Sequence, residues 1–116
     1  MKRDLDCLFC QIVDGKQPSG KVWENGSFLA ISNKYPKAPV HILVMPKKHE
    51  SKKQLASGEG LELYQGMMEA VYAVVREKGL DKTGYKLVNN GAGYNHFDHE
   101  HIHVMGGTKT EPGGES

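Results

Sequence analysis

The sequence predicts an α+β fold in which a five-stranded, mainly antiparallel sheet packs with one long helix. Short apolar runs precede and follow a single long amphipathic segment, and this order of strands, helix and strands is typical of that class. The 116 residues suit one domain of ordinary size. We expect this domain to span residues 1–107, followed by a flexible tail of glycine, proline and charged residues at 108–116.

The first three strands are predicted to lie before residue 47. Residues 21–31 (KVWENGSFLAI) indicate a hairpin, because two apolar runs flank Asn25-Gly26, which is a strong two-residue turn signal. Residues 41–45 (HILVM) form a nearly continuous apolar run, which is typical of a buried strand, and Pro46 ends it.

The long helix is predicted from about Gly60 to Lys78. Its apolar residues recur at helical spacing and form one stripe, which we interpret as core: Leu61, Tyr64, Met67, Met68, Val71, Tyr72, Val74 and Val75. Gly79 followed by Leu80 is typical of a Schellman-type helix end. Two further strands are predicted after the helix, at residues 85–89 (YKLVN) and 99–105 (HEHIHVM).

Charge and hydropathy exclude several classes of protein. The 15 basic residues nearly balance 14 acidic ones, which argues against a broad basic face for a nucleic acid polymer but permits a small phosphate pocket. The longest apolar stretches are far shorter than the roughly 20 residues that a membrane span needs. The N-terminal residues MKRDLDCLFC do not fit a signal peptide. We therefore expect a cytoplasmic protein that binds no membrane.

Three histidines, His99, His101 and His103, alternate with other residues near the end of the chain. In a strand, this period of two places the three imidazoles on one face, while Ile102 and Val104 face the helix. Such a row can cover a phosphate and its leaving group, hold a metal as a three-histidine face, or form an inert polar face. Hydrolysis by a metal on this face would need a nearby carboxylate base, but Glu100 is predicted to point to the opposite face.

The two cysteines of the chain, Cys7 and Cys10, form a CxxC motif. Two cysteines cannot build a disulfide-rich scaffold, and CxxC alone indicates a zinc half-site or a redox pair about equally. A redox pair prefers the start of a helix in a βαβ unit, and no such unit is predicted here.

The motif HEHIHVMGG resembles the signature of the histidine triad (HIT) superfamily. The resemblance extends to CLFCQIVDGKQPSGKVWENGSFLAI, APVHILVMPKKH and LVNNG, and so covers nearly the whole chain in order. The chain is most similar to the short histidine triad nucleotide-binding branch, whose members are nucleoside phosphoramidases. This resemblance implies a HIT-like fold, a homodimer formed through the helix and the neighbouring strand, and a purine nucleotide or nucleotide conjugate as partner.

The resemblance also implies roles for single residues. His101 would attack the α-phosphorus and form a nucleotidyl-histidine, as a neutral imidazole can near pH 7. His103 would bind a phosphate oxygen and assist the leaving group. His41 would lie beside the phosphate, although taken alone it is typical of a strand-end histidine. Further substrate contacts are implied for the phosphate and ribose (Asn89, Asn95, Asn33) and for the apolar base slot (Phe9, Ile12, Ile31, Leu43).

A zinc site follows from the same resemblance. Many bacterial-type members of the branch hold zinc with the residues that correspond to Cys7, Cys10, His49 and His99. Four protein ligands close the coordination sphere, so this zinc would be structural and would fix the triad strand through His99.

Three positions depart from the family pattern, and they affect the expected substrate preference rather than the chemistry. Asn33 stands where relatives often have an aspartate that accepts from the ribose hydroxyls, and an amide accepts less strongly than a carboxylate. His96 replaces a hydroxyl residue just before the triad. Gln17 stands where an apolar residue usually lines the base slot.

We therefore expect a hydrolase that cleaves P–N or mixed-anhydride bonds on purine nucleoside monophosphates. One alternative is a dinucleoside polyphosphate hydrolase, which uses the same nucleophile on a longer substrate. Another is a nucleotide-binding or zinc-binding interaction module with little turnover, which the departures at His96 and Asn33 favour.

Overall fold

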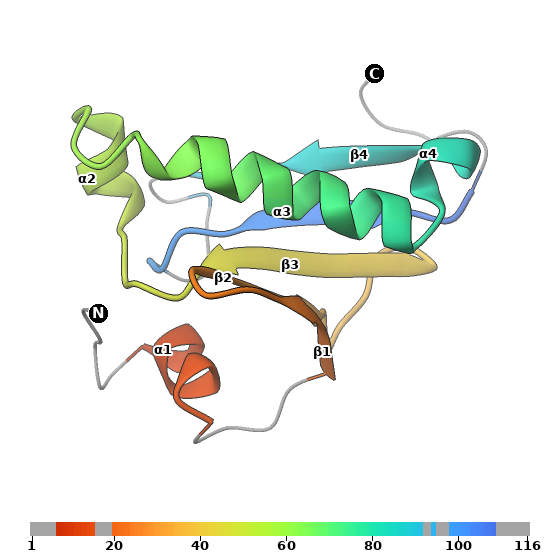
Figure 1. The fold of residues 1–116 in the computed structure, drawn as a ribbon, viewed down its shortest axis with the longest axis horizontal. Coiled ribbons are helices and arrows are strands. Elements are labelled where there is room, and N and C mark those ends of the chain that lie inside the picture. Colours follow the sequence, from red (N-terminus) through yellow and green to blue (C-terminus); the bar gives the residue numbers. More distant parts are fainter. Residues whose placement is uncertain (1–6, 16–19, 92–93, 95–97, 109–116) are drawn as a thin grey trace.

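The computed structural model describes residues 7–15, 20–91, 94 and 98–108, and it confirms the α+β class. Five strands form one sheet in the order β1-β2-β3-β5-β4, with every neighbouring pair antiparallel (Figure 1). The strands are β1 (Gly20–Glu24), β2 (Phe28–Ser32), β3 (Val40–Pro46), β4 (Tyr85–Val88) and β5 (Ile102–Gly106). Within the described residues, no helix is both long enough and apolar enough to span a membrane. Of the predicted tail, residues 109–116 lie outside the described part of the chain.

The β1–β2 hairpin is confirmed, but its turn lies one residue later than predicted. The backbone N–H of Asn25 donates to the carbonyl of Phe28 (3.0 Å), so Gly26 and Ser27 lie between the closing pair. The side-chain oxygen of Asn25 accepts from the backbone N–H groups of Ser27 (2.9 Å) and Phe28 (2.8 Å). Asn25 therefore stabilises the turn through its side chain, in the Asx arrangement, and not as a central residue of the loop.

The predicted long helix is α3 (Leu63–Glu77), which begins a few residues later than Gly60. Leu61 precedes the helix and is 48% exposed, and Tyr72 is 38% exposed, so neither belongs to the buried stripe. Ala70, which the stripe prediction omitted, is fully buried. The residues of α3 that form the core are Met67, Ala70, Val71, Val74 and Val75.

Three short helices were not predicted: α1 (Leu8–Val13), α2 (Lys52–Ala56) and α4 (Leu80–Thr83). Each is too short to show helical periodicity, so only end signals could have predicted them. The Sγ atom of Cys7 accepts from the backbone N–H of Cys10 at the start of α1. Gly79 separates α3 from α4 with a φ of 68°, a conformation that glycine adopts without strain.

The sheet is covered on both faces. Figure 1 shows α3 lying along one side of the sheet and α1 on the other side. On the α3 face, one apolar cluster contains Phe28, Ala30, Ile42, Val44, Ile102 and Val104 of the strands. On the α1 face, a smaller cluster contains Phe9, Leu29, Ile31, Leu43 and Met45. Burial on both faces explains why β2 and β3 are nearly continuous apolar runs.

The last strand is shorter than predicted. β5 begins at Ile102, whereas the predicted strand began at His99. His99 forms an isolated bridge with Ser51, and neither Glu100 nor His101 belongs to the ladder. The alternation of side chains nevertheless continues, because Ile102 and Val104 pack toward α3 while His101 and His103 lie on the other face. The triad segment is therefore held partly by side chains and only partly by the sheet.

Candidate functional site

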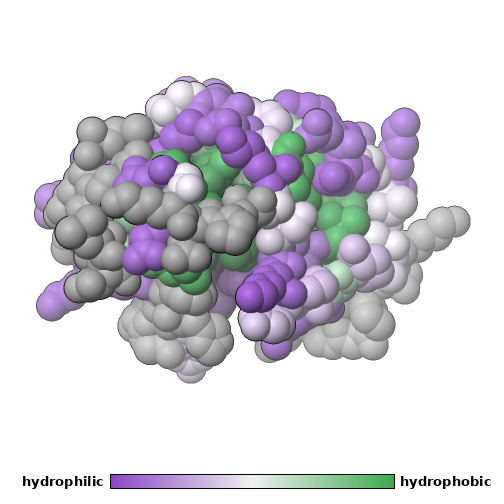
Figure 2. All heavy atoms as spheres, turned by 90° about the horizontal axis from the view of Figure 1, so that it is seen from below, coloured by the Kyte–Doolittle hydropathy of each residue, from purple (hydrophilic) through white to green (hydrophobic). Residues whose placement is uncertain are grey.

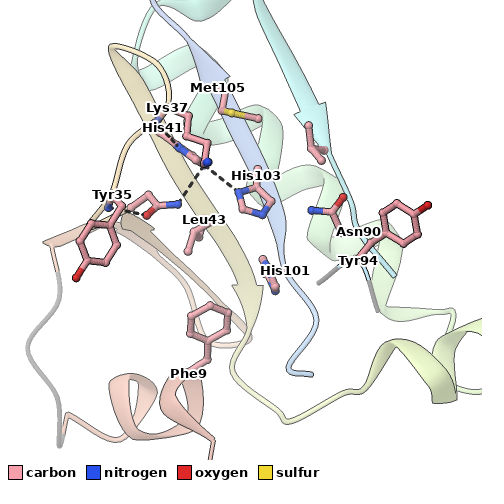
Figure 3. Close-up of a pocket in the computed structure, with 12 residues that line it drawn as sticks. Phe9, Tyr35, Lys37, His41, Leu43, Asn90, Tyr94, His101, His103 and Met105 are labelled. Atoms are coloured by element: carbon pink, nitrogen blue, oxygen red, sulfur yellow. Dashed lines mark hydrogen bonds between the residues drawn. The ribbon is translucent and has the colours of Figure 1, made fainter. Parts of the chain in front are cut away.

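A cavity of about 600 Å³ lies on the face of the sheet opposite α3 (Figure 3). Figure 2 shows apolar residues lying in hollows between hydrophilic ones on the side of the molecule that it views. The cavity combines apolar side chains with three imidazoles and two amides. Its lining residues are Phe9, Asn33, Tyr35, Lys37, His41, Leu43, Val88, Asn90, Tyr94, His101, His103 and Met105.

His101 is held in one tautomer. Its Nδ1 lies 2.8 Å from the backbone carbonyl oxygen of His99. A carbonyl can only accept, so Nδ1 carries the proton and the lone pair of the neutral ring lies on Nε2. The ring of Phe9 packs edge-on against that of His101, with 5.1 Å between centroids, and His101 is only 5% exposed. This geometry suits a neutral imidazole nucleophile.

His103 lies between His101 and His41, with 5.1 Å between ring centroids on either side. The backbone N–H of Lys37 donates to Nδ1 of His41 (3.0 Å), which places the proton of the neutral His41 ring on Nε2. That Nε2 lies 2.9 Å from Nδ1 of His103 and donates to it. The proton of His103 is therefore on its own Nε2. The dashed contacts in Figure 3 show this chain of bonds.

His41 is neutral because of its surroundings. Burial, and after it the positive charge of Lys37, lower the pKa of His41 below its ordinary value of 6.5. Asn33 Nδ2 lies 3.2 Å from His41 Nε2, but both atoms carry hydrogen in this tautomer, so the pair is a contact and not a hydrogen bond. The orientation of the Asn33 amide follows from its other end, where Oδ1 accepts from the backbone N–H of Tyr35 (2.9 Å).

A second cluster lies beside the cavity and consists of Cys7, Cys10, His49 and His99. One ligand atom from each lies within 4.8 Å of the others. The Nδ1 of His99 lies 3.4 Å and 3.5 Å from the two sulfurs, and Nδ1 of His49 lies 3.3 Å from Cys10 Sγ. Tetrahedral zinc bonds of about 2.3 Å to sulfur and about 2.0 Å to nitrogen would separate neighbouring ligands by roughly 3.5 Å. The spacing therefore fits a Cys₂His₂ site.

The tautomer of His99 also fits a metal. Nε2 of His99 donates to the backbone carbonyl of Pro46 (2.6 Å), which leaves the lone pair of Nδ1 directed toward the cysteines. Burial raises the pKa of the Cys7 thiol to about 11, so a bound cation would have to displace its proton. Two thiolates and two imidazoles are a donor set that zinc prefers.

The three triad imidazoles do not converge on one point. His99 is turned toward the cysteines, whereas His101 and His103 line the cavity. Across the described ranges, the cysteine–histidine cluster is the one group of three or more potential metal ligands. The interpretation of the triad as a three-histidine metal face is therefore not supported.

Of the seven predicted substrate contacts, three line the cavity, three lie elsewhere and one lies outside the described residues. Phe9, Leu43 and Asn33 line it, together with His41, His101 and His103, which were predicted as catalytic residues. Ile12 and Ile31 pack in the apolar cluster on the α1 face, as Phe9 and Leu43 do, but they are not among the residues that line the cavity. Asn89 lies on the α3 face, where its Nδ2 donates to Glu100 (3.3 Å) and its Oδ1 accepts from Lys52. Asn95, like His96 and Gln17, lies outside the described residues.

Several lining residues were not predicted from the sequence. Val88 and Asn90 line the cavity, two positions apart, so Asn90 occupies the place that was expected for Asn89. The period of two along the preceding strand was the signal that could have found it. Tyr35, Lys37 and Tyr94 also line the cavity from loops, where no periodicity exists.

The chain matches one family model and several known proteins over most of its length. A family model described as "Scavenger mRNA decapping enzyme C-term binding" matches residues 6–116. An uncharacterized HIT-like protein of Chlamydia trachomatis serovar D is 37% identical over 105 residues, which cover 89% of this chain and 94% of that protein.

Three solved structures with the same fold carry histidine triad or HIT names. A histidine triad protein from Clostridium difficile has a TM-score of 0.87 and 37% identity, covering 99% of this chain and 100% of that one. A HIT family hydrolase from Legionella pneumophila Philadelphia 1 has a TM-score of 0.79 and 32% identity, covering 94% and 100%. A Zn-bound histidine triad family protein from Mycobacterium smegmatis has a TM-score of 0.77 and 29% identity, covering 88% and 75%.

Proposed function

Because this chain belongs to the histidine triad (HIT) superfamily, we propose that it is a nucleotide-binding hydrolase acting on purine nucleoside monophosphate conjugates. The bond cleaved is a P–N or mixed-anhydride bond, and the reaction passes through a nucleotidyl-histidine. The observation that carries this proposal is the hydrogen bond from His101 Nδ1 to the carbonyl of His99 (2.8 Å), which leaves Nε2 nucleophilic at the cavity. The hydrolase name of the Legionella relative supports the reaction class.

The first half-reaction transfers the nucleotidyl group to His101. Nε2 attacks the α-phosphorus, a bond forms between nitrogen and phosphorus, and the bond to the leaving group breaks with its electron pair. A leaving amine takes a proton from solvent, whereas a leaving carboxylate or phosphate needs none. The ring becomes cationic, and its Nδ1–H bond to the carbonyl of His99 stabilises that charge.

The second half-reaction restores the enzyme. Water attacks the phosphorus and releases its proton to solvent, and the bond to Nε2 breaks so that His101 returns to the neutral form. His103 supports both steps, because its Nε2–H can donate to a phosphate oxygen on which charge increases. His41 holds His103 in that tautomer through the 2.9 Å bond between their rings.

The remaining lining residues suit a nucleoside. Phe9 and Leu43 provide apolar contact for a base, and the amides of Asn33 and Asn90 can bond ribose hydroxyls or phosphate oxygens. We assign the amide role near the phosphate to Asn90 in place of Asn89, because the Asn89 side chain bonds Lys52 and Glu100.

We also propose that Cys7, Cys10, His49 and His99 hold one zinc ion. Its donor set and the Zn-bound relative from Mycobacterium smegmatis support this. A bound zinc ion would take no part in the reaction itself, and its role would be to fix the position of His99. The carbonyl of the same residue orients the His101 ring.

A homodimer through α3 and β4 is the assembly that we propose. The rings of Tyr72 on α3 and Tyr85 on β4 pack edge to face, with 6.2 Å between centroids. They remain 38% and 39% exposed, so together they form an aromatic surface that a second copy can cover.

The function is tested with a fluorogenic adenosine phosphoramidate. Steady turnover and rapid-quench trapping of a nucleotidyl-enzyme, with the label mapped to His101, are the expected results. A diadenosine polyphosphate assayed in parallel tests the alternative substrate class. Label on His103 or His41, or tight nucleotide binding without turnover of either substrate, would contradict the proposal.

A further inference from the structure

A buried carboxylate lies directly behind the nucleophile. Glu100 is 1% exposed and points away from the cavity, toward the α3 face of the sheet. Its Oε2 accepts from Lys52 Nζ of α2 (2.8 Å), from the hydroxyl of Tyr64 on α3, and from Asn89 Nδ2 after β4 (3.3 Å). Three separate elements therefore hold one oxygen of this carboxylate.

The other oxygen of the carboxylate bonds the nucleophile itself. Oε1 of Glu100 accepts from the backbone N–H of His101 (3.1 Å). This contact matters because His101 lies outside β5, so no strand ladder orients it. The backbone of the segment is also bonded at Glu100, whose N–H donates to the carbonyl of Glu50 (2.7 Å).

We propose that Glu100 is a positioning residue for His101: it fixes the backbone of the nucleophile by accepting its N–H and by tying that backbone to α2, α3 and the end of β4. This inference rests on the proposed function, since it concerns the residue assigned as nucleophile. The carboxylate touches no substrate and acts only through His101. Its effect is to hold the imidazole in the attacking position between turnovers.

A second reason favours positioning over mere stabilisation. A buried ion pair between Glu100 and Lys52 is weak evidence for stability, because apolar residues of similar volume often replace such pairs without loss. What apolar residues cannot replace is the acceptor that the carboxylate provides for the His101 N–H and, at its other oxygen, for the Tyr64 hydroxyl and the Asn89 amide. The two roles of Glu100 can therefore be separated by mutation.

Two variants make that separation. In Glu100→Leu/Lys52→Met, both charges are removed together, so no unpaired charge is buried, but the acceptor for the His101 N–H is lost. In Glu100→Gln, the side-chain oxygen can still accept that N–H, while the charge opposite Lys52 is lost. The control for loss of an ion pair is Glu24→Leu/Lys47→Met, which removes a 2.8 Å pair between the end of β1 and the residue after β3; its lysine is 15% exposed against 16% for Lys52, and its carboxylate is 38% exposed against 1% for Glu100.

The two variants are expected to separate rate from stability. Glu100→Leu/Lys52→Met also leaves the hydroxyl of Tyr64 and Nδ2 of Asn89 without their shared acceptor, so its thermal midpoint should fall, as that of Glu100→Gln does. Its kcat per folded molecule for the phosphoramidate should nevertheless be reduced about 10- to 100-fold, with KM changed by less than about twofold. Glu100→Gln should lower the midpoint but keep kcat per folded molecule within about threefold. The control should change neither kinetic constant by more than about twofold. If kcat follows the midpoint across all variants, Glu100 only stabilises the fold and the proposal is wrong.

Amide hydrogen exchange tests the same inference without activity. In the double variant at Glu100 and Lys52, the His101 amide should exchange at least about tenfold faster, while the Val104 amide in β5 keeps its wild-type rate. Unchanged exchange at His101 would overturn the proposal even if kcat falls. A wild-type protein that lacks turnover contradicts the proposed function instead, and the exchange result then still decides whether Glu100 positions His101.

Discussion

The backbone carbonyl of His99 accepts a hydrogen bond from Nδ1 of His101 at 2.8 Å, while the ring of His99 points to Cys7 and Cys10. One residue thus contributes its side chain to the candidate metal cluster and its backbone to the candidate nucleophile. This relationship predicts that loss of the cluster affects the fold first and the chemistry through the fold.

His101→Ala is expected to abolish turnover of adenosine phosphoramidates while nucleotide affinity stays within about threefold. Covalent catalysis needs a nitrogen at attacking distance, whereas binding is spread over the apolar slot and the amides. Rapid-quench trapping and equilibrium titration with the nucleoside monophosphate measure the two effects. A variant that turns over at the wild-type rate would remove His101 from the mechanism.

His103→Ala is expected to lower kcat by roughly 10²–10⁴-fold, which is less than the loss at His101. The substitution removes the Nε2–H donor but leaves the nucleophile in place. The labelled nucleotidyl-enzyme should still form, only more slowly, in a single-turnover experiment. Complete absence of the intermediate in this variant would instead make His103 the attacking residue.

Removal of zinc is expected to destabilise the protein before it impairs the chemistry. A metal site filled at about 1,000 times its Kd stabilises the fold by about 4 kcal/mol, which corresponds to roughly 10 °C or more in the thermal midpoint of a small domain. Cys10→Ala should lose this amount, and chelation should lower the wild type to the same level. The kcat per folded molecule should fall much less.

Elemental analysis provides the direct check on the metal prediction. Protein purified without chelator should contain one zinc ion per chain, and Cys10→Ala should contain little. Protein that is free of zinc, yet as stable with chelator as without it, would contradict the assignment of this cluster.

Acidification is expected to destabilise the fold through His41. Its pKa in the folded protein lies below the ordinary value of 6.5, so the unfolded chain binds a proton at this residue over a range where the folded protein does not. The stability that His41 contributes is therefore complete above about pH 6.5 and is lost as the pH falls toward the lowered value. Urea unfolding of the wild type and of His41→Asn, at several pH values from 7.5 to 5, gives the free energy of unfolding of each protein as a function of pH. The wild type should lose stability more steeply than His41→Asn as the pH falls. Equal slopes for the two proteins would contradict the prediction.

If the proposed dimer forms, the wild-type protein should sediment with the mass of two chains at micromolar concentration. Tyr72→Glu should shift the equilibrium toward the monomer, because it places a charge on the aromatic surface formed with Tyr85. The matched control is Tyr35→Glu, since Tyr35 is 73% exposed in the loop between β2 and β3 and lies away from α3. A wild-type protein that sediments cleanly as a monomer would exclude the dimer.

The fold class and the main elements were accessible from the sequence, because each depends on residues that are close together along the chain. The apolar run at 41–45 and the stripe in α3 follow from periodicities of two and of 3.6 residues, and both are confirmed in position within a few residues. The four residues predicted to hold a metal do lie together in the structure, and they were named from the family resemblance and not from spacing alone.

Only the tertiary structure decided which side chains meet. The bonds from His41 to His103 and from Lys52 to Glu100 join residues far apart in the sequence, and they depend on the order of β3 and β5 and on the place of α2. The same packing turns Asn89 to the α3 face and Asn90 to the cavity, and it takes His101 out of the strand ladder. A local pattern determines the direction in which a side chain points, whereas its partner is determined by how the elements pack, and that packing is a property of the whole chain.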